Sequence, residues 1–338
     1  MRSSGLLTSL SYFGLAAALA TPKLGQDVIN TAGGAPPNGP PPTNLSANAI
    51  SGFQLANFLE NLEAAFFEAG VKNMTSNGGW GMETFGPLSV QTIEMIAAQE
   101  QVHVATIQAI LAPSNSTISP CNYTFPVESA ADFVALASTI TSVGIGAVNF
   151  LTASLATTDP DLVTGTSSII TVESRHDAFF RERMGLVPNP APFDTQLPGE
   201  WAYSLALPFV VKDSCTLLPI TALPPLAITG GTNSWSATAS SNSEYERPVT
   251  INLLWDAQNV PGAADNNTQL FVAWVNQANA AVYTNVTRVD QNTGTAPVPQ
   301  GLNGITFAAL TNQTAFNTPA DLVANTLAGP VPYVPDLH

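Results

Sequence analysis

Two Glu-x-x-His pairs, Glu100/His103 and Glu173/His176, restrict the fold of this chain more than any other feature of its sequence. Three residues turn an α-helix through about 300°, so on a helix each glutamate shares a face with its histidine. One such pair alone would favour an ordinary helix-surface contact, worth roughly a few tenths of a kcal/mol. Two pairs on different helices instead predict a shared interior site, because carboxylate and imidazole are good ligands for iron or manganese.

Apolar periodicity predicts four helices before residue 185. The expected helices cover residues 47–69, 87–111, 130–156 and about 162–184. Gly70 is expected to end the first helix, and Pro87 suits the first turn of the second. The last two helices are joined by a short turn and should be antiparallel neighbours, whereas the second and third are separated by a crossover long enough to run from one end of a bundle to the other.

The third helix has no charged residue after Asp132, which leaves two interpretations, a transmembrane span or a buried central helix. Its many serines and threonines, together with Asn149, count against a membrane span, and no basic cluster flanks it. These observations favour a helix buried in the centre of the bundle.

The first helix carries two glutamates, Glu60 and Glu63, within an apolar stripe that includes Leu59 and Leu62. An unpaired carboxylate is costly in such surroundings, so a neighbouring metal or cation would explain both residues. The alternative is that one or both lie at the edge of the stripe in solvent, and for Glu63 both interpretations stay open. Glu68, one position beyond the stripe, is expected to be exposed.

Four segments carry a resemblance to a known family. They are Leu-Glu-Asn-Leu-Glu-Ala-Ala-Phe-Phe at 59–67, Gln-Glu-Gln-Val-His at 99–103, Val-Glu-Ser-Arg-His at 172–176 and Pro-Phe-Asp-Thr-Gln-Leu at 192–197. The chain resembles the ferritin-like domain of secreted fungal stress-response proteins and plant desiccation-related proteins over residues 47–215. The resemblance implies a ferritin-like bundle with metal positions at Glu60 or Glu63, Glu100, His103, Glu173 and His176.

One departure from this family concerns the third helix. Where such domains usually have an acidic residue, this chain has Thr141 and Ser142. A dinuclear iron centre normally uses four carboxylates and two histidines. The site is therefore expected to be completed by Glu63, to hold one metal, or to be empty, with Thr141 and Ser142 hydrogen-bonded to the remaining carboxylates.

After Pro219 the pattern changes to short apolar runs separated by Gly, Pro, Asn and Asp. Strands are expected at residues 249–255, 270–275, 281–289 and 305–310. The predicted fold is α+β with two domains, a ferritin-like four-helix bundle followed by a small C-terminal immunoglobulin-like (Ig-like) β-sandwich. The expected organisation is a signal peptide at 1–20, a Pro/Gly-rich linker at 21–45, the bundle with a trailing segment at 46–218 and the β-sandwich-like domain at 219–338.

The N-terminal residues predict secretion. One basic residue, Arg2, precedes an apolar run that ends in Ala18-Leu19-Ala20, as in a cleavable leader. A membrane anchor is the alternative, but the run is short and is followed directly by Pro22. Asn-x-Ser/Thr glycosylation acceptors, which suit an extracellular chain, lie at Asn44, Asn73, Asn115, Asn122, Asn266, Asn285 and Asn312.

The two cysteines, Cys121 and Cys215, are expected to form one disulfide in an oxidising compartment, with two reduced core thiols as the alternative. The net charge of -15 would repel phosphate backbones and anionic lipid, which makes nucleic acid an unexpected partner. No membrane span is expected after removal of the leader. Cell-wall or other extracellular components and a second copy of the chain remain possible partners.

Two functions fit these features. The favoured one is a non-catalytic, acidic, secreted glycoprotein that acts at the cell surface or wall during stress, with a degenerate metal site. The alternative is a secreted iron- or manganese-dependent oxidoreductase of the di-metal carboxylate type. A hydrolase is disfavoured, since any Ser-His-acid triad would have to use one of the two paired histidines and no Gly-x-Ser-x-Gly motif is present. Sugar binding through Trp255 and Trp274 is also disfavoured, because strand tryptophans are more often core residues.

Overall fold

The structure is a computed structural model of the full chain. It describes residues 24–76, 79–80, 87–232, 250–260, 262, 265, 267–316 and 318–335. The expected signal peptide and the acceptor Asn266 lie outside the described residues. The other six predicted glycosylation acceptors are all exposed.

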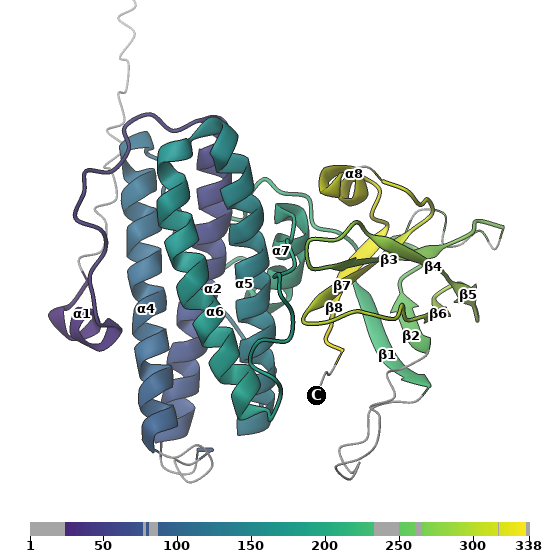
Figure 1. The fold of residues 1–338 in the computed structure, drawn as a ribbon, viewed down its shortest axis with the longest axis horizontal. Helices are drawn as coiled ribbons and strands as arrows, with labels where there is room; N and C mark the ends of the chain where they lie inside the picture. Colours follow the sequence, from purple (N-terminus) through teal and green to yellow (C-terminus); the bar gives the residue numbers. More distant parts are fainter. Residues whose placement is uncertain are drawn as a thin grey trace, which may run out of the picture.

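Four long helices form a bundle (Figure 1). They are α2 (Ala47–Thr75), α4 (Pro87–Leu111), α5 (Ala130–Thr158) and α6 (Val163–Arg183). Helix α2 packs against α4 and α5, and α5 packs against α6. Helices α2 and α5 each have a serine N-cap. Ser46 accepts a hydrogen bond from the backbone N–H of Ala49, and Ser129 accepts one from that of Asp132.

The predicted end of the first helix at Gly70 is wrong, since α2 continues to Thr75. The reason is a close approach between helices rather than a turn. A Cβ atom at position 70 would overlap the ring of Phe133 on α5. Glycine is therefore used here to let a buried aromatic ring lie against the helix backbone, and its low helix propensity is outweighed by that packing.

Helix α5 is long and apolar enough to cross a membrane by length and composition, but 72% of its most apolar window is buried inside the protein. Figure 1 places it between the rest of the bundle and the β-strands. This placement agrees with the central buried helix expected from the sequence, since a helix that is apolar on all sides needs partners on all sides.

The predicted disulfide is confirmed. Cys121, in the crossover between α4 and α5, is bonded to Cys215, which follows α7 (Gly199–Ala206). Backbone hydrogen bonds reinforce the same junction, from Thr124 N–H to the Phe209 carbonyl and from Val211 N–H to the Asn122 carbonyl, both at 2.8 Å. The crossover is thereby attached to the segment that leads out of the bundle.

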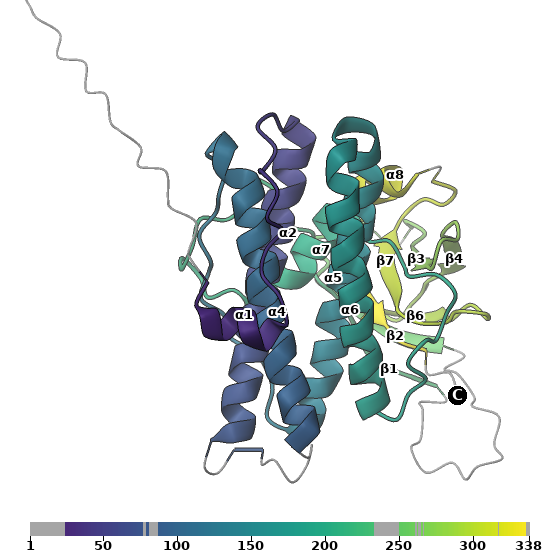
Figure 2. The same cartoon turned by 60° about the vertical axis from the view of Figure 1, so that its left-hand side comes forward.

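The residues expected to form a linker also contain structure. Helix α1 (Gln26–Ala32) lies across the outer side of α4 (Figure 2). It ends at Gly33, which adopts a left-handed conformation with φ of 78°. The described chain is therefore ordered well before Ser46, where folded structure was expected to begin.

The C-terminal part contains two four-stranded antiparallel sheets, so the whole is an α+β arrangement. The strand orders are β1-β2-β6-β5 and β4-β3-β7-β8. The strands are β1 (Leu226–Thr232), β2 (Thr250–Trp255), β3 (Phe271–Asn276), β4 (Val282–Asn285), β5 (Thr287–Arg288), β6 (Thr293–Pro297), β7 (Thr306–Thr311) and β8 (Ala328–Tyr333), and α8 (Pro319–Ala324) precedes the last of them.

Strand β7 is buried on both faces because its sheet lies between the bundle and the other sheet. Phe307 and Ala309 belong to the same apolar core as the bundle helices, whereas Ala308 and Leu310 face the core between the two sheets. Helix α7 fills the space between bundle and sheet (Figure 1), and the Trp201 indole N–H on α7 donates to the Thr326 hydroxyl at 3.2 Å. The bundle and the sheet β4-β3-β7-β8 thus share one apolar core, and a second core lies between the two sheets.

Candidate metal centre

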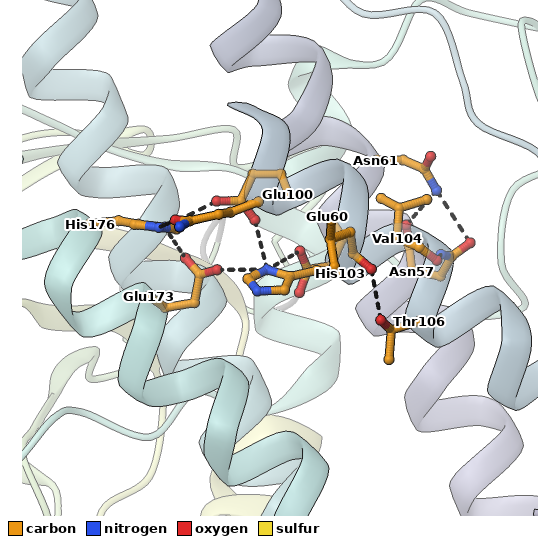
Figure 3. A network of polar contacts seen from close by, with 11 residues as sticks. Asn57, Glu60, Asn61, Glu100, His103, Val104, Thr106, Glu173 and His176 are labelled. Atoms are coloured by element: carbon orange, nitrogen blue, oxygen red, sulfur yellow. Dashed lines mark hydrogen bonds and ion pairs between the residues drawn. The ribbon is translucent and has the colours of Figure 1, made fainter. Parts of the chain in front are cut away.

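Three helices of the bundle place six ionisable side chains in its interior. Helix α2 supplies Glu60 and Glu63, α4 supplies Glu100 and His103, and α6 supplies Glu173 and His176. All six are buried, with exposed fractions of 0 to 8%. Five of them face one another in Figure 3, and the same spacing that was seen in the sequence brings each glutamate of a Glu-x-x-His pair beside its own histidine.

The nitrogen Nδ1 of His103 faces three carboxylates from three different helices. It lies 3.0 Å from Glu100 Oε2, 3.1 Å from Glu173 Oε1 and 3.3 Å from Glu60 Oε2. A single ring nitrogen carries at most one proton, so it can donate a full hydrogen bond to only one of these oxygens.

The second histidine uses the remaining oxygens of two of the same carboxylates. His176 Nδ1 lies 3.1 Å from Glu100 Oε1 and 3.3 Å from Glu173 Oε2. Glu100 and Glu173 therefore each direct one oxygen toward His103 and the other toward His176 (Figure 3). This is the arrangement of two carboxylates shared between two neighbouring ligand positions.

The geometry fits a metal ion. Ligand atoms bound about 2.1 Å from one ion at right angles are about 3.0 Å from each other, close to the separations around His103 Nδ1. One donor atom from each of Glu60, Glu100, His103 and Glu173 lies within 4.8 Å of the others. In addition, Glu60 Oε2, Glu100 Oε1 and Glu173 Oε1 are buried, and each faces a histidine Nδ1 that it must share with another carboxylate oxygen, a costly condition that a bound cation would relieve.

Without a cation, protons must balance the charge of this cluster. Burial, opposed in part by His103, raises the pKa of Glu60 to about 8. Burial and then the neighbouring carboxylates, Glu173 first, raise the pKa of Glu63 well above its ordinary value. Burial by itself would lower the pKa of His176, but the charge of Glu173 and hydrogen bonds to Glu100 and Glu173 outweigh it and raise that pKa to about 10. The metal-free cluster is thus a set of sites that hold protons where a metal would otherwise bind.

Gln99 determines which nitrogen of His176 is available to the cluster. Its Nε2 donates to the Ala32 carbonyl at the end of α1 at 3.2 Å, and its Oε1 lies 2.7 Å from His176 Nε2. Because a carbonyl can only accept, the amide NH₂ must face Ala32 and the amide oxygen must face the histidine. In its neutral, metal-binding form His176 then carries its proton on Nε2, and the lone pair of Nδ1 is left to face the cluster between Glu100 and Glu173.

Glu63 lies on the side of the cluster where the third-helix carboxylate is missing. A Cβ atom at Gly144 on α5 would be 2.5 Å from Glu63 Oε1, so glycine leaves room for this carboxylate. Thr141 is fully buried and its hydroxyl has no hydrogen-bond partner within the described residues, whereas Ser142 is hydrogen-bonded to Asp177. The expected alternative, in which these two hydroxyls bind the cluster carboxylates, is therefore not what the structure has.

The helical region matches the ferritin-like domain family over residues 48–186. This is the class that the four helices and the two Glu-x-x-His pairs define. The chain is similar to Protein rds1 of the fission yeast Schizosaccharomyces pombe, with 24% identity in an alignment that covers 71% of this chain and 69% of that protein. The resemblance to ferritin-like proteins inferred from the sequence is thereby confirmed.

Two residues with a role at the centre were not identified from the sequence. Gln99 precedes Glu100 and lies one helical turn before His103, so its position in the motif was a usable clue. Gly144 had no comparable clue, because its importance comes from Glu63 on another helix. Glu63 itself, which the sequence left undecided, is 4% exposed and lies in the interior rather than at the edge of the apolar stripe.

Proposed function

We propose that this chain is a secreted ferritin-like metalloprotein that holds iron or manganese among Glu60, Glu63, Glu100, His103, Glu173 and His176. The observation that carries the proposal is the sharing of Glu100 and Glu173 between the two Nδ1 atoms of His103 and His176. Surface pairs that stabilise helices would leave these groups in solvent, whereas here they converge in the interior.

The six side chains would have distinct tasks. Glu100 and Glu173 face both histidines and would be shared, Glu60 faces His103, and Glu63 supplies the fourth carboxylate from α2 in place of one from α5. Bound iron or manganese would supply redox chemistry with a small oxidant such as dioxygen or peroxide. The chain's own contribution is to exclude bulk water, fix the ligand orientations and release protons as a cation enters.

For the biological role, we propose an acidic glycoprotein that acts outside the cell, at the surface or wall, during stress. The disulfide, the six exposed glycosylation acceptors and the family resemblance support this role. Extracellular or cell-wall components and a second copy of the chain are the proposed partners, and the net charge of -15 argues against nucleic acid.

Metal analysis of the protein purified from its native secretion route tests the metal site. The variant Glu100→Gln/Glu173→Gln removes the two shared carboxylates, and Glu94→Ala/Glu182→Ala is its matched control, with exposed glutamates on the same two helices. Stoichiometric iron or manganese in the native protein and in the control, but not in the first variant, is expected. A folded native protein that binds neither metal would refute the proposal.

Oxygen or peroxide consumption by the metal-loaded protein separates the two functional alternatives. An oxidoreductase would consume the oxidant in repeated turnovers, and Glu100→Gln/Glu173→Gln would abolish that activity. A non-catalytic extracellular protein would bind metal without sustained consumption of either oxidant.

We also infer an immunoglobulin-like topology for the C-terminal sheets. In constant-type immunoglobulin domains the sheets contain strands A-B-E-D and C-F-G. If β1 to β8 are lettered A, B, C, C′, D, E, F and G, the strand orders β1-β2-β6-β5 and β4-β3-β7-β8 become A-B-E-D and C′-C-F-G. The extra strand C′ beside C, as in variable-type domains, supports the inference.

A further inference from the structure

A cavity of about 210 Å³ lies where the bundle meets the β-strands, on the side of α6 away from the metal cluster's histidines. Its walls come from α5, α6, the segment 188–195 and the loop 303–305 that precedes β7. The side chains at its deep end are buried and include Ser142 and Arg181, whereas Phe193 and Asp194 at its rim are exposed.

The wall formed by segment 188–195 is held firmly at its C-terminal end. The Thr195 hydroxyl donates to the Ile305 carbonyl and accepts from the Gln277 N–H, both at 2.7 Å. On the other side the Leu197 N–H donates to the Gly146 carbonyl of α5 at 3.0 Å. The cavity is therefore bounded by fixed backbone rather than by a free loop.

Arg181 is a buried polar residue of this cavity whose side chain lacks a full set of hydrogen-bond partners among the described residues. It is 2% exposed and lines the cavity. Its Nε donates to the Val187 carbonyl at 2.8 Å, which fixes the guanidinium, but Nη2 has no hydrogen-bond partner among the described residues. An unpartnered donor at such depth is costly, so a ligand oxygen that accepts from Nη2 would be favoured.

The charges around the cavity favour a neutral ligand. One cation, Arg181, and two carboxylates, Asp177 and Asp194, line it. An anion would meet the two carboxylates and a cation would meet the arginine, whereas a ligand with several hydroxyl groups can accept from the guanidinium and donate to the carboxylates. Asp177 already accepts from the Ser138 hydroxyl at 2.6 Å, and as an ionised carboxylate it retains further acceptor sites.

The rim adds an aromatic surface. Phe193 is 62% exposed, which is unusual for a phenylalanine, and its ring borders the cavity. A sugar ring presents hydroxyl groups at its edge and apolar C–H groups on its face, so it matches a polar interior with an aromatic rim. The volume is below the range of about 300–1,000 Å³ that drug-sized ligands occupy, which limits the occupant to roughly one ring.

We propose that this cavity binds a single neutral sugar unit, with Arg181, Asp177 and Asp194 contacting its hydroxyl groups and Phe193 covering its apolar face. The site is separate from the metal centre and does not depend on whether metal is bound. Trp255 and Trp274, which were considered for sugar binding from the sequence, are 3% and 1% exposed and take no part in it.

Calorimetric titration of the secreted protein with sugars of similar shape but different charge tests the ligand class. The probes are D-glucose, which is neutral, D-glucuronate, which is anionic, and D-glucosamine, which is cationic at neutral pH. We expect glucose, or its neutral analogues D-mannose and N-acetyl-D-glucosamine, to bind more tightly than either charged probe. The methyl glycosides of the neutral sugars, as models of a glycan's terminal unit, will show whether the site prefers a free sugar or a terminal one.

Phe193→Ala tests whether the sugar binds at this cavity, because an exposed side chain can be shortened without disturbing the fold. It should weaken neutral sugar binding about 3- to 10-fold, as expected for loss of an aromatic contact, and leave metal content unchanged. Val289→Ala is the matched control, since Val289 is 72% exposed and follows β5, on the side of the β-strands away from the bundle (Figure 1). Arg181→Lys should also weaken sugar binding, and the melting temperature of this variant would reveal any loss of folding.

Three outcomes would overturn the proposal. They are no binding of any neutral sugar, tighter binding of glucuronate or glucosamine than of the neutral probes, and equal sugar affinity in Phe193→Ala and the unaltered protein. None of them bears on the metal site, which the metal content of the same samples reports separately.

Discussion

At the scale of single residues, hydrogen bonds from neighbouring residues hold the side chains of the candidate metal centre in fixed orientations. Gln99 is an example, because its amide is oriented by the Ala32 carbonyl and in turn selects the tautomer of His176. Metal-binding histidines commonly donate their second ring N–H to such a partner, and loss of the partner weakens metal binding.

Gln99→Ala is therefore expected to lower affinity for the ion at His176 by about 10- to 100-fold, with less effect on the ion at His103. Competition titration with a metal-sensitive chelator would measure both steps. Gln101→Ala, which removes a contact to the exposed Glu68, serves as the control and should leave both affinities unchanged. Equal affinities in Gln99→Ala and the unaltered protein would contradict the assigned role.

The contact between Gly144 and Glu63 leads to a second prediction. Gly144→Ala would place a methyl group 2.5 Å from Glu63 Oε1, so we expect a loss of about 1–3 kcal/mol in the free energy of unfolding and weaker metal binding. Urea unfolding would measure the change. Gly165→Ala on α6 is the control, since nothing lies within 4 Å of the added atom and the change should stabilise by up to about 1 kcal/mol. A Gly144→Ala protein as stable as the unaltered one would show that Glu63 is not confined there.

At the scale of helices and strands, the long crossover between α4 and α5 forms no helix or strand of its own between Ser114 and Ala130. It is held instead by the Cys121–Cys215 disulfide and by backbone pairing of residues 122–124 with residues 209–211. The two cysteines are separated by 94 positions, so the bond closes a long loop and strongly restricts the unfolded chain.

Replacing both cysteines by serine should lower the free energy of unfolding by about 2–4 kcal/mol. Metal binding should persist, because both cysteines are remote in sequence from the six ligands and the backbone hydrogen bonds of the junction remain. Chemical denaturation with and without metal would check both statements. Loss of metal binding in a variant that is still folded would show that the crossover helps to position the ligands.

At the scale of the whole molecule, the interior cluster links stability, pH and metal. The pKa of Glu60 rises from 4.5 to about 8 on folding and that of His176 from 6.5 to about 10. A pKa that is raised on folding contributes stability that is present below the unfolded-state value and is lost as pH rises through the folded-state value. The lowered pKa of Glu100, caused by hydrogen bonds to His103 and His176 that outweigh burial, acts in the opposite direction but only under acidic conditions.

The metal-free protein should therefore become less stable between about pH 6 and about pH 9, while the stabilisation produced by iron or manganese should increase over the same range. Melting temperatures of chelator-treated and metal-loaded samples across this range provide the measurement. Metal stabilisation that stays constant or decreases with rising pH would mean that the cluster does not exchange protons for metal.

Features that depend on residues close together in the sequence were predicted, whereas several features that depend on distant residues were missed. The four helices, the interior placement of both Glu-x-x-His pairs and the disulfide were predicted, because periodicity, i to i+3 spacing and a single cysteine pair leave few alternatives. Strands β1, β6 and β8 were missed, since their Gly and Pro residues resemble loop segments until neighbouring strands pair with them.

Residue spacing was enough to predict a helical bundle with two carboxylate–imidazole pairs on its inner faces, because those properties depend on residues close together along the chain. Packing between distant segments, in contrast, places Glu63 inside the bundle, allows α2 to continue through Gly70, and joins α1 to His176 through Gln99. Each of these depends on a partner from a distant segment, Gly144, Phe133 or Ala32, and local spacing carries no information about such partners.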